Sequence, residues 1–186
     1  MKKIVFLLLI LLFLTTGCSV KKADEVTDAE IFASEYAISK DHVFRYASIS
    51  DIVDLFDSGT GVIFFGNSDQ EESLNILKMF SSLIEKEEIG EVLYFNPVVI
   101  RDDMTNDYDR LTTLLGDNLT ITKDGDSYLE VPSVYFVKDG SIIGYNDDAS
   151  KIVEIEEEKL NEFYENLEDE YLNLIKEYLN DDKSIE

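Results

Sequence analysis

Cysteine, histidine and basic residues are all scarce in this sequence of 186 residues. The single cysteine cannot form a disulfide within the chain, and the single histidine, His42, has no second histidine or cysteine at metal-ligand spacing. With no glycine-rich phosphate loop either, we expect no cofactor. Sixteen Lys and Arg against 40 Asp and Glu give a formal charge of -24, which disfavours nucleic acids and anionic membrane surfaces as electrostatic partners.

The N-terminal apolar run is too short to span a bilayer. Residues 4–14 are eleven consecutive apolar residues after a Lys-Lys pair, whereas a transmembrane helix needs about 20. This pattern predicts a signal peptide over residues 1–17. Residues 14–18 (LTTGC) resemble a bacterial lipobox, which implies lipid on Cys18, followed by a tether over residues 18–26. An ordinary secretory signal with a chance cysteine is the alternative.

Residues 59–80 contain the pattern around which the rest of the chain can be placed. Residues 61–65 (GVIFF) are continuously apolar and β-branched or aromatic, which is typical of a strand buried on both faces. Ser68 and Glu71 have capping-box spacing and predict the start of a helix. The helix has an apolar stripe at helical spacing, formed by Leu74, Leu77, Phe80 and Ile84.

Other segments complete an α/β pattern within a single domain over residues 27–180, followed by an acidic tail over residues 181–186. Thr27 with Glu30 predicts a capped helix, and either Ser48 or Ser50 caps another that ends near residue 56. The remaining predicted elements are a strand at 43–47, a strand at 91–95 placed for a parallel sheet, an Asp-Gly turn at 123–127, a hairpin at 131–145 and a long amphipathic helix at 155–179.

Acidic residues crowd the start of a predicted helix over residues 102–116. The carboxylates belong to Asp102, Asp103, Asp107 and Asp109. They could form a calcium site, or they could complement the dipole at the helix N-terminus. Because the segment lacks the D-x-D-x-D-G loop of an EF-hand, the sequence favours the dipole interpretation.

Several of these segments resemble the thioredoxin-like fold, and more closely the Gram-positive thioredoxin-like proteins related to bacteriocin-transport accessory proteins. The resemblance covers roughly residues 32–145 and is carried by GTGVIFFG at 59–66, YFN at 94–96, IRD at 100–102 and VPSVYFVKDG at 131–140. It implies a central mixed sheet of four to five strands flanked by helices, with a long C-terminal helix. The two cysteines of the family's C-x-x-C motif fall on Gln70 and Ser73, with Glu71 and Glu72 between them. The family also places a cis peptide bond before Pro132, so that Val131 and Pro132 face the C-x-x-C positions.

The sequence thus predicts a lipoprotein on the extracytoplasmic face of a Gram-positive cell membrane, without redox cysteines and without enzymatic activity. Its expected partners are the membrane, through lipid on Cys18, and an extracytoplasmic protein or extended peptide held beside Gln70, Ser73 and Pro132. The alternative is a thiol-disulfide oxidoreductase relative, or a bacteriocin-export accessory protein, that keeps activity through a partner. Disulfide exchange requires a thiolate, and the chain has no cysteine after Cys18.

Overall fold

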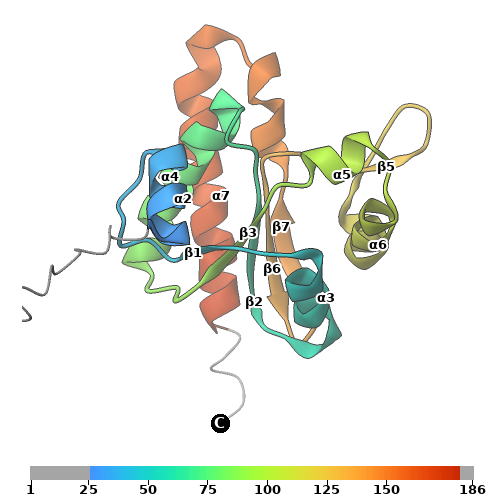
Figure 1. Cartoon of the computed structure of the whole chain (residues 1–186). Coiled ribbons are helices and arrows are strands. Elements are labelled where there is room, and N and C mark those ends of the chain that lie inside the picture. The colour runs from blue at the N-terminus through green and yellow to red at the C-terminus, as the bar shows by residue number, and fades with distance from the viewer. Residues whose placement is uncertain (1–25, 181–186) are drawn as a thin grey trace, which may run out of the picture.

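A mixed five-stranded sheet forms the centre of the computed structural model, which describes residues 26–180 (Figure 1). The spatial order of the strands is β1-β3-β2-β6-β7. The first three in this order run parallel, and β6 and β7 are each antiparallel to their neighbour. The strands are β1 (Phe44–Tyr46), β2 (Gly61–Phe65), β3 (Val92–Phe95), β6 (Ser133–Lys138) and β7 (Ser141–Asn146), and a separate ribbon pairs β4 (Thr120–Ile121) with β5 (Ser127–Tyr128).

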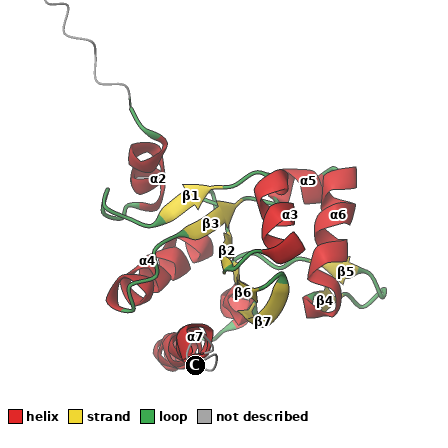
Figure 2. Cartoon of the chain, turned by 90° about the horizontal axis from the view of Figure 1, so that it is seen from below, coloured by secondary structure: helices red, strands yellow, loops and turns green. Residues whose placement is uncertain are grey.

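Helices cover both faces of this sheet, as Figure 2 shows. One face packs against α2 (Asp28–Tyr36), α4 (Glu71–Lys86) and α7 (Leu160–Asn180), and the other packs against α3 (Ile49–Ser58) and α6 (Asn106–Leu115). Short helices complete the chain: α5 (Val98–Asp102) and the 3₁₀ turns Gly116–Asn118, Asp148–Glu154 and Glu157–Lys159. The prediction of an α/β domain with a mixed central sheet and a long C-terminal helix is confirmed.

Strand β2 is the centre of two hydrophobic cores. Val62 and Phe64 belong to the core on the α4 and α7 side, whereas Ile63 and Phe65 belong to the core on the α3 and α6 side. All four side chains are completely buried, and burial of each contributes about 1.5–3 kcal/mol. This explains why the sequence of the strand is continuously apolar and does not alternate between apolar and polar residues.

Two of the predicted helix starts are confirmed, and both are capping boxes, although only the one at Thr27 was predicted as such. Thr27 and Glu30 bond reciprocally at the start of α2, and Ser48 and Asp51 do the same at the start of α3. Ser48, and not Ser50, is therefore the cap. The Ser48 hydroxyl and backbone N–H both donate to the Asp51 carboxylate, and together they lower the pKa of Asp51 to about 2.

Two predicted helices have different bounds in the structure. Residues 102–116 do not form one helix, because Met104 adopts a left-handed conformation (φ 48°) between α5 and α6, and Thr105 caps α6. The C-terminal helix begins at Leu160, later than predicted, since the preceding segment forms 3₁₀ turns.

The ends of the chain lie outside the described residues. The predicted signal peptide, the lipidated Cys18, the acidic tail and most of the tether fall in residues 1–25 and 181–186, and they stay predictions. Across residues 26–180, no helix has both the length and the apolar character needed to span a bilayer.

Candidate functional site

The turn between β2 and α4 is organised by Asn67, which is almost completely buried. Its backbone N–H donates to Ser73 Oγ at 3.2 Å, which ties the turn to the first turn of α4. Its side-chain Oδ1 accepts from the backbone N–H of Asp69 at 3.1 Å and from Asn96 Nδ2 at 3.2 Å. Asn96 directly follows β3, so the ends of two neighbouring parallel strands are joined by side-chain amides.

These bonds explain why the predicted capping box at Ser68 and Glu71 does not form. Helix α4 begins one residue after Gln70, its N-cap residue, and Gln70 makes no side-chain cap bond. The Asn67 side chain already bonds the backbone two residues on, and Asn67 N–H takes Ser73 Oγ as its acceptor. A local Asn-based turn has therefore displaced the capping box that the sequence spacing favoured.

Two buried tyrosine hydroxyl groups are hydrogen-bonded in series to the backbone at the start of this turn. Tyr36 OH donates to Tyr94 OH at 2.6 Å, and Tyr94 OH donates to the carbonyl oxygen of Gly66 at 3.0 Å. Burial raises the pKa of Tyr94 to about 12. A Cβ atom on Gly66 would lie 2.6 Å from Phe64 Cε1, so only glycine fits where the backbone passes over this ring.

The four residues at which the sequence resemblance would place C-x-x-C, residues 70–73, lie at the start of α4. Gln70 and Glu72 are half-buried, Glu71 is exposed, and Ser73 is completely buried. Ser73 Oγ lies 3.5 Å from Gln70 Oε1, so the two side chains face each other. Within residues 26–180, no histidine or carboxylate is hydrogen-bonded to Ser73, so the hydroxyl has no base to activate it.

The second half of the candidate site is the segment before β6. The Val131–Pro132 peptide bond is cis. Phe65 pairs with Ser133 in the antiparallel ladder of β2 and β6, so continuing this register by one residue places Gly66 opposite Pro132. Among residues 26–180, neither the backbone N–H nor the carbonyl of Val131 has a hydrogen-bond partner.

The backbone just before this segment is firmly held. The Leu129 carbonyl accepts from Arg101 at 3.1 Å, and the Leu129 N–H donates to Tyr108 OH at 3.1 Å. Arg101 also lies over the ring of Tyr128, 4.7 Å from its centroid. Two buried or half-buried side chains from α5 and α6 thus fix the approach to Val131.

The other candidate residues do not join this site. His42 bonds the backbone of Ala29 and Phe44, and its ring packs against that of Phe32 at a tilt of 46°, so its contacts are structural. Asp102 and Asp103 are at the end of α5, whereas Asp107 and Asp109 are in the first turn of α6. Within the described range, no three His, Cys, Asp or Glu side chains are grouped so that they could hold a metal ion.

Searches against family models, curated proteins and solved structures found no match to this chain.

Proposed function

We propose that this chain is a lipid-anchored extracytoplasmic protein of thioredoxin-like fold that has no redox chemistry and binds an extended segment of another polypeptide. The binding surface, here called the Val131 surface, consists of the turn at residues 67–70 and the segment at residues 130–132. The proposal draws on the resemblance in sequence, on the β2–turn–α4 arrangement, and on the β2–β6 register that brings these two segments to the same end of the sheet.

The unpaired backbone of Val131 is the observation that carries the proposal. Buried backbone N–H and carbonyl groups in folded proteins are almost always paired, yet both groups of Val131, a residue that is only 9% exposed, lack a partner within residues 26–180. The residue lies next to the end of the β2–β6 ladder. An extended segment passing Val131 would gain two backbone hydrogen bonds, which is the physical basis of recognition by strand addition.

The surroundings favour binding over catalysis. The Val131 surface is held in place by the buried contacts of Asn67 and Tyr108 and the half-buried contact of Arg101, so little backbone ordering is needed when a partner binds. Disulfide exchange requires a thiolate, and Cys18, the proposed lipid attachment site, is the only cysteine. No observation on the described residues favours the oxidoreductase alternative.

Photo-crosslinking in the membrane tests this proposal. A photoreactive amino acid replaces Asp69, which is exposed in the turn, and in a matched control it replaces Glu165, which is exposed on α7. We expect light-dependent capture of a defined polypeptide at position 69 and not at position 165. Equal capture at both positions, or none at position 69, would contradict a binding role for the Val131 surface.

A further inference from the structure

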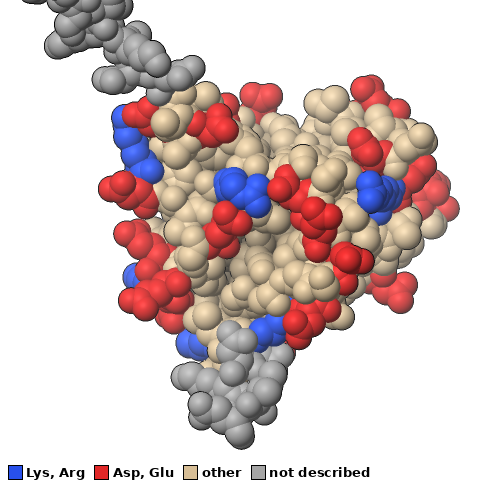
Figure 3. All heavy atoms as spheres, turned by 60° about the horizontal axis from the view of Figure 1, so that its bottom comes forward, with Lys and Arg blue, Asp and Glu red and all other residues tan. Residues whose placement is uncertain are grey.

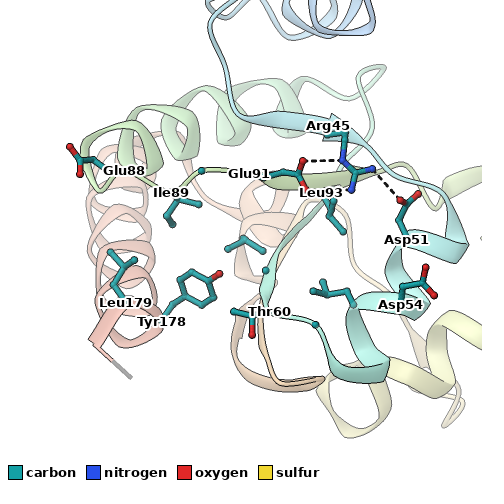
Figure 4. A pocket seen from close by; sticks show the side chains of 15 residues that line it. Arg45, Asp51, Asp54, Thr60, Glu88, Ile89, Glu91, Leu93, Tyr178 and Leu179 are labelled. Atoms are coloured by element: carbon teal, nitrogen blue, oxygen red, sulfur yellow. Dashed lines mark hydrogen bonds and ion pairs between the residues drawn. The ribbon is translucent and has the colours of Figure 1, made fainter. Parts of the chain in front are cut away.

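A cavity of about 540 Å³ lies at the opposite end of β2 and β3 from the Val131 surface (Figure 4). Its walls come from the first residues of both strands, the middle of α3, the link between α4 and β3, and the last turn of α7. It is here called the lower cavity. Its volume is within the range of about 300–1,000 Å³ that is usual for binding pockets.

The floor of the lower cavity is apolar. Leu55, Val62, Ile89 and Leu93 are buried there, and the half-buried Tyr178 forms one wall. Lys138 Nζ donates to the Tyr178 carbonyl at 2.9 Å, which holds the end of α7 against the sheet. An occupant must therefore bring apolar surface as well as polar groups.

The rim of the lower cavity is acidic. Four acidic residues (Asp51, Asp54, Glu88 and Glu91) and a single basic residue, Arg45, line the cavity. Arg45 is already engaged at 3.1 Å by both Asp51 and Glu91 (Figure 4). Asp54 and Glu88 are exposed, and neither side chain has a hydrogen bond or ion pair with another residue of the described chain.

The face around the cavity has the same character. Figure 3 brings this end of the molecule forward and shows acidic side chains spread over it, with few Lys or Arg among them. A negative potential of this kind repels anionic ligands and accelerates the association of cationic ones.

We propose that the lower cavity binds a basic, partly apolar segment of a partner polypeptide. Lysine or arginine side chains of that segment pair with Asp54 on one side of the cavity and with Glu88 on the other (Figure 4), and an apolar side chain between them contacts Leu55 and Tyr178. The charge complementarity selects the basic residue, and the apolar floor distinguishes such a segment from a simple cation. This site shares no residue with the Val131 surface and does not depend on its function.

Binding of two synthetic peptides to the full-length chain in detergent tests this inference. One fluorescent peptide alternates leucine and lysine, and the other alternates leucine and glutamate. We expect anisotropy to show binding of the lysine peptide only. Asp54→Lys combined with Glu88→Lys is expected to weaken it about tenfold or more, since attraction is replaced by repulsion at two positions.

Two further variants separate a site from general charge attraction. Glu165→Lys with Asp169→Lys changes the net charge equally on the exposed face of α7 and is expected to leave affinity within about twofold. Gly90→Trp is expected to weaken binding as strongly as the rim reversal, because a Cβ at Gly90 meets no atom within 4 Å and the ring can occupy the cavity mouth.

Three results would overturn the inference: no binding of the lysine peptide to the wild-type chain, equal losses from the rim and α7 reversals, or full affinity in a folded Gly90→Trp variant. Circular dichroism establishes folding, and if Gly90→Trp does not fold, the comparison of the two charge reversals decides. Crosslinking at position 69 is expected to be unchanged in the rim variant. A negative result in the peptide-binding test therefore does not contradict the proposed function, which the crosslinking tests separately.

Discussion

Replacing Tyr171 with phenylalanine is expected to stabilise the protein. The Tyr171 side chain is completely buried against Phe80, and its hydroxyl has no hydrogen-bond partner within residues 26–180. An unpaired buried polar group costs about 1–3 kcal/mol, whereas the void left by removing the hydroxyl costs about 1 kcal/mol. The difference predicts that Tyr171→Phe raises the free energy of unfolding by about 1 kcal/mol, or the Tm by about 2–4 °C.

Tyr94 supplies a matched control for this substitution. It is also buried, but its hydroxyl accepts from Tyr36 and donates to the Gly66 carbonyl. Tyr94→Phe leaves the Gly66 carbonyl without its donor and Tyr36 without its acceptor, so it is expected to lower the free energy of unfolding by about 2–3 kcal/mol.

Urea unfolding followed by far-UV circular dichroism measures both effects, because the chain contains no tryptophan. The urea midpoint is expected to rise for Tyr171→Phe and to fall for Tyr94→Phe, with an unchanged m value in each case. A loss of 1 kcal/mol or more in Tyr171→Phe would show that the hydroxyl is satisfied, and would refute the reasoning.

Three further predictions concern the candidate site, the buried tyrosines and the anchor. Gln70→Cys with Ser73→Cys is expected to form a disulfide under mild oxidant, because Ser73 Oγ and Gln70 Oε1 are 3.5 Å apart and Gln70 is the extended N-cap residue of α4, where a backbone shift can bring the Cβ atoms from the helical spacing of about 5–6 Å into the disulfide range of about 3.5–4.5 Å; complete alkylation of both thiols would contradict this geometry. Stability is expected to fall as pH rises above about 10, where the tyrosines of the unfolded chain ionise. Burial raises the pKa of Tyr36 and Tyr135 in the folded state, so the folded chain keeps protons that the unfolded chain releases, and rising pH therefore favours the unfolded chain. A urea midpoint that stays constant from about pH 8 to 11 would count against this prediction. Cys18→Ser is expected to abolish partitioning into the detergent phase, since two acyl chains anchor a protein stably and none remain; wild-type protein found free in the medium with an unmodified Cys18 would exclude the lipid anchor.

The parts of the fold that sequence predicted are those fixed by nearby residues. The capping box at Thr27 and the cap at Ser48, one of two serines that the sequence allowed, involve residues three positions apart, and the apolar run of β2 reflects burial on both faces. Such signals need no knowledge of distant contacts. The capping box predicted at Ser68 and Glu71 does not form although its spacing is ideal. The bonds that Asn67 makes with Asp69 and Ser73 are equally local and replace it.

The supports of the candidate site were harder to predict, since their partners are far away in sequence. Asn67 and Asn96 are 29 residues apart, and Arg101 and Leu129 are 28 apart. Polar residues directly after two parallel strands were the one available signal for the asparagine pair. The unpaired state of Val131 depends on where the β2–β6 ladder ends, which neither Val131 nor Pro132 indicates by itself.

Hydrogen exchange at the Val131 amide tests the central claim most directly. The full-length chain, labelled with ¹⁵N in detergent, is compared with and without a synthetic peptide taken from the polypeptide captured at position 69. The Val131 N–H is expected to exchange rapidly in the free protein and to become protected when the peptide binds, because the peptide supplies the missing acceptor. Peptide binding that leaves Val131 exchange unchanged, or an amide already protected in the free protein, would contradict the proposed surface.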